Sequence, residues 1–158
     1  MEPSPTPFSH SIGLRWADLD PNGHARHSVY YDWAATVRLA YLEHKGVGLS
    51  WLTTHGIGPV LFREEARFLK ELRLGDKVEI DLRLAAASDD GRKWRIRHHL
   101  RRGTEDAAII EVDGAWLDLR ARKIVTPPVQ LVDVFSDVAR TEDFTVLVSG
   151  RTAAPRSP

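Results

Sequence analysis

Carboxylates and imidazoles concentrate in one short segment, residues 15–28, which reads Arg-Trp-Ala-Asp-Leu-Asp-Pro-Asn-Gly-His-Ala-Arg-His-Ser. It contains two carboxylates, Asp18 and Asp20, and two imidazoles, His24 and His27. Side chains of these types act as general bases or nucleophiles, or bind metal ions. The segment is therefore the first candidate for a functional site.

Metal binding is the first chemistry to weigh. The pattern Asp-x-Asp-x-Asn-Gly at residues 18–23 matches the first half of an EF-hand calcium loop, but the twelfth position of that loop requires a bidentate carboxylate and is Val29 here. A transition-metal site that combines these carboxylates with His24 and His27 is a weaker alternative, because no helical or strand spacing holds the four side chains. We predict no metal site.

Acyl transfer is the second chemistry, and it depends on a helix predicted directly after the segment. Ser28 is the expected N-cap and Gly46 the expected C-terminal cap. Large and apolar residues recur between them at spacings of three and four: Val29, Tyr30, Trp33, Val37, Ala40, Tyr41 and His44. The start of a helix presents backbone N–H groups that can stabilise an oxyanion, and a carboxylate on the preceding loop can attack a carbonyl or activate water.

The rest of the chain predicts an α+β domain at residues 8–148, with tails at 1–7 and 149–158. Strands are expected at 8–16, 60–69, 78–84, 94–101 and 107–123, and further helices at 49–54 and 129–138. We expect a chain break at residues 56–59 and a bulge near Gly114. The last four strands read as a meander, so an antiparallel sheet wrapped around the long helix is the simplest fold.

Composition narrows the function classes. The 158 residues include 22 basic and 22 acidic side chains, which argues against a broad nucleic-acid surface. There is no cysteine, so thiolate nucleophiles and cysteine-bound zinc are excluded, and no G-x-S-x-G motif occurs. Neither a membrane-spanning run nor a signal-peptide pattern is present, so we expect a cytoplasmic protein without membrane contact.

The segment from Arg15 to His24, with Tyr30-Tyr31-x-Trp33 after it, resembles the active-site signature of the 4-hydroxybenzoyl-CoA thioesterase-like branch of the hotdog-fold acyl-CoA thioesterases. The resemblance covers about residues 8–128 and includes weaker motifs at Gly75-Asp76, 115–118 and Pro127-Pro128. It departs at residues 25–27, where many relatives have Val-Asn-Asn and this chain has Ala-Arg-His.

The resemblance implies a hotdog fold and hydrolysis of an acyl-CoA or acyl-carrier thioester without a cofactor. Carried over, it assigns Asp20 as nucleophile or general base, the backbone amide of His27 as oxyanion donor, and Gly23 as the residue that permits the close turn. It also implies a homodimer that can pair again into a tetramer, with sites at the subunit interface.

Several residues keep two interpretations. His24, Tyr30 and Trp33 are candidates for substrate binding, although aromatic residues at helical spacing more often belong to the core. Asp18 is expected to cap or pair locally, and Glu64 and Glu65 are candidate second carboxylates. The arginine-rich strands read mainly as a solvated face with a few contacts to CoA phosphates.

Two alternative functions stay open. One is a non-catalytic acyl-CoA-binding protein in which Asp20 serves only the turn. The other, ranked lower, is a hotdog hydratase or dehydratase, suggested by the Asp, Asn and His at positions 20, 22 and 24.

Overall fold

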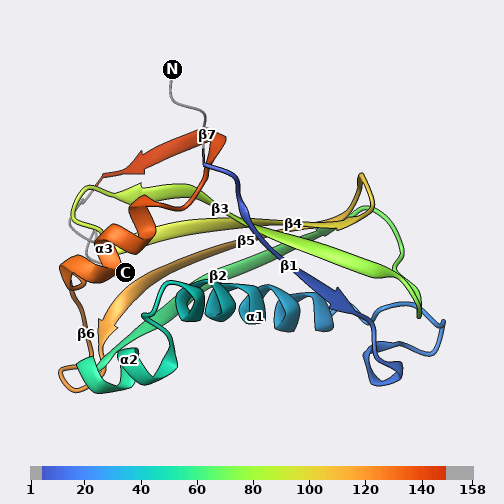
Figure 1. Ribbon diagram of the computed structural model, residues 1–158, viewed down its shortest axis with the longest axis horizontal. Coiled ribbons are helices and arrows are strands. Elements are labelled where there is room, and N and C mark those ends of the chain that lie inside the picture. Colours follow the sequence, from blue (N-terminus) through green and yellow to red (C-terminus); the bar gives the residue numbers. More distant parts are fainter. Residues whose placement is uncertain (1–4, 149–158) are drawn as a thin grey trace, which may run out of the picture.

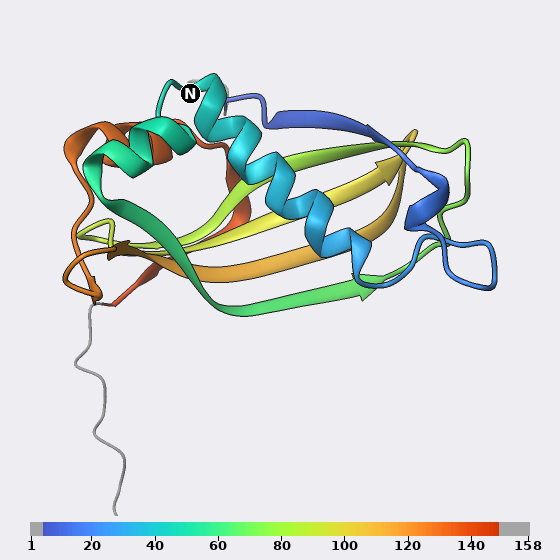
Figure 2. The same cartoon turned by 90° about the horizontal axis from the view of Figure 1, so that it is seen from below.

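The computed structural model describes residues 5–148. One curled sheet wraps around a single long helix, α1 (Val29–His44), which crosses the concave face of the sheet (Figure 1; Figure 2). The predicted C-terminal tail, 149–158, and the first four residues of the predicted N-terminal tail lie outside the described residues. The α+β architecture expected from the sequence is confirmed, and it is the hotdog arrangement.

The strands and shorter helices have the following bounds: β1 Phe8–Gly13, the 3-10 turn η1 Trp16–Asp18, α2 Leu49–His55, β2 Ile57–Phe68, β3 Lys77–Ser88, β4 Lys93–Arg102, β5 Glu105–Asp118, β6 Lys123–Ile124, α3 Val129–Ser136 and β7 Arg140–Leu147. The main strands lie in the order β1-β3-β4-β5-β2. Among residues 5–148, no helix has the length and apolar composition needed to cross a membrane.

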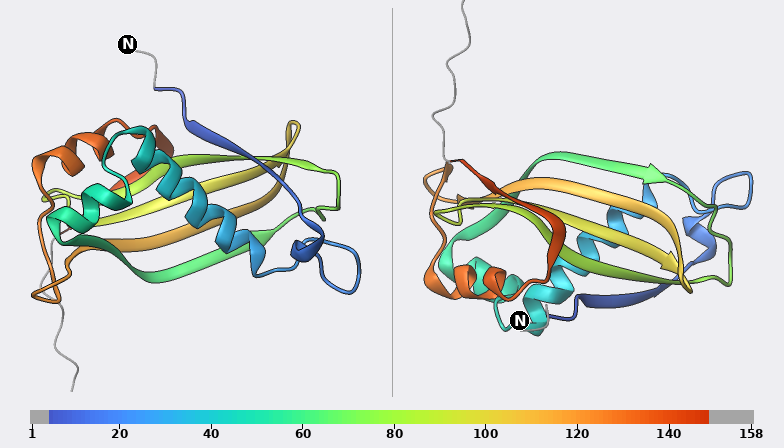
Figure 3. Two further views of the ribbon diagram at one scale, coloured as in Figure 1. Left: turned by 60° about the horizontal axis from the view of Figure 1, so that its bottom comes forward. Right: turned by 90° about the horizontal axis from the view of Figure 1, so that it is seen from above.

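The predicted four-strand meander is wrong for β2. Of the four strands predicted to form it, β3, β4 and β5 are sequential antiparallel neighbours, whereas β2 pairs with β5 at the far side of the sheet. The strand β7, which the sequence did not predict, pairs in parallel with β3 after α3 has returned the chain (Figure 3). Alternating apolar residues specify which face of a strand is buried, and they leave its neighbour unspecified.

Alternation on β3 and β4 builds the core as predicted. Val78, Ile80, Leu82 and Leu84 of β3 are buried, and so are Trp94, Ile96, His98 and Leu100 of β4. Five of the seven residues in the predicted stripe on α1 are buried: Val29, Tyr30, Trp33, Val37 and Tyr41. Ala40 is half-buried and His44 is exposed, whereas Ala34, which lies outside the predicted stripe, is fully buried. The core therefore lies between α1 and the concave face of the sheet.

The two ends of α1 behave differently from each other. At the C-terminal end, Gly46 has φ +76°, the Gly46 N–H donates to the Glu43 carbonyl, and the Val47 N–H donates to the Leu42 carbonyl, which is a Schellman motif. At the N-terminal end, Ser28 occupies the cap position but makes no side-chain capping hydrogen bond. Ser28 therefore lies at the predicted cap position, but its side chain does not cap the helix.

The expected break at residues 56–59 and the expected bulge in β5 are corrected. Gly56 (φ +62°) ends α2, and β2 already begins at Ile57 and contains Pro59. Proline is tolerated there because β2 is an edge strand among the described strands. The register shift falls in β2 at Phe62, opposite Gly114, which itself pairs regularly with Trp94. A Cβ at Gly114 would overlap the Trp94 indole, so packing explains this glycine.

Candidate active site

Asp20 lies in a tight turn that leads into α1. The Gly23 N–H donates to the Asp20 carbonyl (3.0 Å), and the Asp20 N–H donates to the His24 carbonyl (2.7 Å). Gly23 has φ +77°, a conformation that residues with a Cβ rarely adopt, although a Cβ there would meet no atom within 4 Å. Backbone conformation alone therefore explains glycine in this turn.

The Asp20 carboxylate is anchored through one oxygen. Oδ1 accepts hydrogen bonds from the N–H groups of Asn22 (2.8 Å) and His24 (3.2 Å). Within residues 5–148, no donor is bonded to Oδ2. The turn thus fixes the direction of the carboxylate and leaves its second oxygen available for a proton or a carbon atom.

The start of α1 offers free backbone donors. The Arg26 N–H donates to the Asp18 carbonyl and the Val29 N–H to the Arg26 carbonyl, whereas the N–H groups of His27 and Ser28 donate to no acceptor in the described part of the chain. Ser28 Oγ accepts a hydrogen bond from Arg26 Nη1 (2.5 Å) and makes no capping hydrogen bond to the first backbone N–H groups of α1. Unpaired amides at this end carry partial positive charge.

A surface depression of about 310 Å³ brings most of the predicted site residues together. Its lining consists of Asp20, His24, Ala25, His27, Tyr30, Phe68, Leu69, Lys70 and Glu71. His24 Nε2 lies 3.1 Å from a Glu71 carboxylate oxygen. Burial raises the pKa of Tyr30, and the negative charges of Asp20 and Glu71 raise it further. The depression is therefore a polar site with one aromatic wall.

Trp33 does not line the depression. It is buried and packs against Tyr30, with the ring centroids 5.3 Å apart, while Tyr30 meets Phe68 edge-on at 5.0 Å. Of the three residues predicted to bind substrate, His24 and Tyr30 reach the depression, and Trp33 supports Tyr30 from the core.

The residues at the end of β2 were missed in the sequence. Phe68, Leu69, Lys70 and Glu71 reach the depression only because β2 crosses to the far side of the sheet and ends beside the start of α1. No local motif marks them. A correct prediction of the β2–β5 pairing would have been needed to place them near Asp20.

The other candidate acids lie elsewhere. Asp18 is buried and accepts hydrogen bonds from the Arg15 N–H (2.9 Å) and from Arg15 Nη2 (2.7 Å), and these contacts hold the pKa of Asp18 below its ordinary value. It pairs locally, as expected. Glu64 pairs with Arg38 on α1, and Glu65 pairs with Arg63, so neither contributes a second carboxylate beside Asp20.

Arginines on the outer face of the sheet are already paired with carboxylates. Arg95 Nε lies 2.5 Å from Asp113, and Arg97 binds Asp143 through both terminal nitrogens, at 2.9 and 3.0 Å. Within residues 5–148, no three histidine, aspartate or glutamate side chains are grouped so that they could hold a metal ion. Phosphate contacts from Arg95 and Arg97 would have to compete with carboxylates that already neutralise them.

Comparison with solved structures supports the fold. A hypothetical protein from Aquifex aeolicus is 22% identical, with 82% of this chain and 99% of that chain covered and a TM-score of 0.76. A 1,4-dihydroxy-2-naphthoyl-CoA thioesterase from Synechocystis is 15% identical (84% and 97% covered, TM-score 0.74). A hypothetical protein from Staphylococcus aureus, crystallised with CoA, is 17% identical (98% and 99% covered, TM-score 0.77).

A search of the curated proteins gave no match. The family model described as the thioesterase-like superfamily matches residues 14–140, a span that begins just before the Asp20 turn and ends at the first residue of β7. It therefore includes the whole depression at the start of α1. On this match the chain belongs to the thioesterase-like superfamily.

Proposed function

We propose that this protein hydrolyses an acyl-CoA or acyl-carrier thioester to the free acid and the thiol. The observation that carries the proposal is that a half-anchored carboxylate, Asp20, and His27, whose amide is unpaired in the described part of the chain, line one depression. Family membership and thioesterases of the same fold agree with this chemistry.

The proposed reaction uses the two halves of the site in turn. Asp20 Oδ2 takes a proton from water as the water oxygen adds to the thioester carbon, or adds to that carbon itself and is released by water. The carbonyl oxygen becomes an oxyanion that accepts a hydrogen bond from the His27 N–H. The carbon–sulfur bond then breaks. In the general-base variant the departing thiolate receives the proton that Asp20 took from water. In the nucleophilic variant the thiolate leaves an acyl–Asp20 anhydride, and the water that hydrolyses this anhydride supplies the proton of the thiol. In both variants one water molecule is consumed.

Neighbouring residues have supporting roles in this proposal. Gly23 keeps the turn that directs Asp20, and Tyr30 forms the aromatic wall against which the acyl group or the pantetheine chain would lie. His24, which is paired with Glu71, presents an imidazole at the edge of the site for contact with the substrate. The resemblance further predicts a homodimer, which sedimentation of the purified protein tests.

The test is hydrolysis of a panel of acyl-CoAs, followed with a thiol reagent, by the wild type and by Asp20→Asn. Asparagine can accept the same two turn hydrogen bonds through its carbonyl oxygen, so the fold should persist while the base is lost. We expect kcat/KM to fall by roughly 10²–10⁴-fold. Full activity in Asp20→Asn would refute the mechanism, and tight CoA-ester binding without thiol release from the wild type would favour the non-catalytic alternative.

A further inference from the structure

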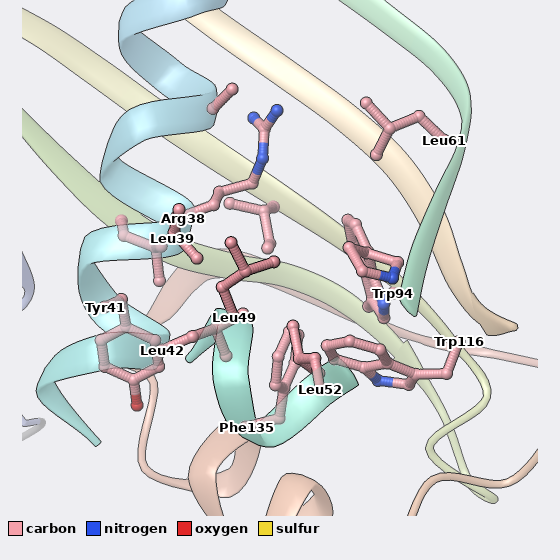
Figure 4. A pocket seen from close by; sticks show the side chains of 14 residues that line it. Arg38, Leu39, Tyr41, Leu42, Leu49, Leu52, Leu61, Trp94, Trp116 and Phe135 are labelled. Atoms are coloured by element: carbon pink, nitrogen blue, oxygen red, sulfur yellow. The ribbon is translucent and has the colours of Figure 1, made fainter. Parts of the chain in front are cut away.

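A second cavity, of about 320 Å³, lies under the C-terminal half of α1, between that helix, α2 and the sheet (Figure 4). Its walls are almost entirely apolar. An aromatic cluster closes one part of it, in which Trp94 and Trp116 are 6.2 Å apart and Trp116 meets Phe135 edge-on at 5.3 Å. Leu49 and Leu61 line it and are exposed at the surface. A cavity of this size and lining suits a small ring or a short apolar chain.

One charged side chain, Arg38, also lines this cavity, and two neighbours hold it in place. Arg38 Nη2 donates to Glu64 Oε1 (3.3 Å), and Arg38 Nη1 lies 3.3 Å from His98 Nε2. His98 Nδ1 lies 2.7 Å from the Asp81 carbonyl oxygen, which only accepts, so Nδ1 carries the proton and Nε2 accepts from Arg38. Burial, followed by the charge of Arg38, lowers the pKa of His98 to about 3, so the imidazole is neutral near pH 7.

Unused hydrogen-bond donors remain at the cavity. A guanidinium has five N–H groups. Glu64 and His98 account for two, so three have no acceptor among residues 5–148, although the Arg38 side chain is only 13% exposed. A guanidinium can only donate, so an occupant that brings an acceptor oxygen would satisfy Arg38 donors that the protein leaves unpaired. The Trp94 indole N–H is also buried without an acceptor in the described part of the chain, and the Trp94 side chain lines the same cavity.

The ion pair between Arg38 and Glu64 favours a neutral acceptor oxygen over a charged one. Glu64 already neutralises Arg38, and a second carboxylate would lie near Glu64 in an apolar cavity, where like charges repel strongly and desolvation is costly. A neutral acceptor, such as a keto oxygen, takes the spare N–H groups without either cost. We propose that this cavity binds an apolar, preferably aromatic, group bearing a neutral acceptor oxygen, which Arg38 recognises by hydrogen bonding.

The cavity is distinct from the Asp20 depression within one protomer. Arg38 is ten residues beyond Ser28, which places it roughly 15 Å along the helix from the oxyanion amides. Identifying the bound group as the acyl part of a substrate rests on the proposed function. The recognition chemistry of the cavity does not, so it can be tested with small molecules that contain no thioester.

The experiment compares three probes of nearly equal shape by calorimetric titration of the full chain. Acetophenone carries a neutral acceptor oxygen, α-methylstyrene replaces that oxygen with a methylene group, and benzoate carries a charge. We expect acetophenone to bind about tenfold more tightly than α-methylstyrene and more tightly than benzoate, as expected for a hydrogen bond to a charged donor. Two-dimensional NMR of the Trp94 and Trp116 indole N–H groups locates the site.

Variants assign the preference to Arg38. Arg38→Met combined with Glu64→Gln removes the donor without leaving a buried charge, and it should bring the acetophenone-to-α-methylstyrene ratio close to one. Arg63→Met is the matched control, because Arg63 is also paired with carboxylates but lies outside the cavity. Asp20→Asn should bind all probes as the wild type does, so loss of hydrolysis and loss of this site are separable.

Three results would overturn the inference. They are equal affinity for acetophenone and α-methylstyrene, tighter binding of benzoate than of acetophenone, and absence of binding by every probe. A tenfold preference that survives in the double variant would equally exclude Arg38 as the donor.

Discussion

Replacing Gly23 with alanine sets backbone strain against the hydrogen bonds of the Asp20 turn. A Cβ at this position meets no neighbour within 4 Å, so the cost is that of placing alanine at φ +77°, about 1–2 kcal/mol. Escaping the strain would break three hydrogen bonds, from the N–H groups of Gly23, Asn22 and His24 to Asp20. At roughly 0.5–1.5 kcal/mol each, the three together are worth about as much as the strain or more.

We therefore expect the turn to persist and the strain to appear as lost stability. Gly23→Ala should lower the free energy of unfolding by about 1–2 kcal/mol, or the melting temperature by about 2–8 °C for a domain of this size, with kcat/KM within about threefold of the wild type. Gly23→Asn should recover part of this loss, because asparagine tolerates positive φ.

Urea unfolding and acyl-CoA hydrolysis, measured on the same preparations, make the test. Gly13→Ala is the control, since Gly13 lacks a positive φ and a Cβ there also meets nothing within 4 Å. A tenfold or greater loss of kcat/KM in Gly23→Ala with unchanged stability would show that the turn rearranges, and would refute the comparison of strain with hydrogen bonds.

Two further predictions concern packing and pH. Gly114→Ala should destabilise the fold by about 1–3 kcal/mol in urea unfolding, because the new Cβ overlaps the Trp94 indole; stability equal to that of Gly13→Ala would contradict this. Arg15 holds the pKa of Asp18 below its ordinary value, so this pair stabilises the fold above the ordinary aspartate pKa, and the contribution is lost as the pH falls through the lowered pKa of the folded protein. Asp18→Asn should flatten the acid side of the stability profile, and an unchanged acid side would argue against the Arg15 contact.

Local pattern predicted the parts of the fold that local physics determines. The alternation of Val78, Ile80 and Leu82 specified the inward face of β3, and the spacing on α1 specified the stripe that packs on it. The Asp-Pro-Asn-Gly sequence specified the turn at Gly23, because few residues other than glycine adopt positive φ.

The same alternation of apolar residues could not predict which strands pair with each other. The position of β2 beside β5, and of β7 beside β3, depends on which edges remain open after the other strands have paired. That is why Glu71, which meets His24 in the depression, was missed, and why Glu64, a candidate second carboxylate, instead meets Arg38. Trp33, for which both a pocket and a core interpretation were open, packs in the core against Tyr30, because helical spacing does not distinguish a pocket wall from the core behind it.

The irregularities of β2 have a consequence for aggregation. An open strand edge is a template on which further chains can add without limit. Pro59 offers no N–H to such a chain, and the register shift at Phe62 interrupts the regular spacing of the edge. Residues 63–68 remain as a regular edge, about 20 Å long, and four of these six side chains are charged: Arg63, Glu64, Glu65 and Arg67. The edge is therefore short and charged. It favours pairing with a strand of complementary charge, and uncontrolled fibre-like growth is disfavoured.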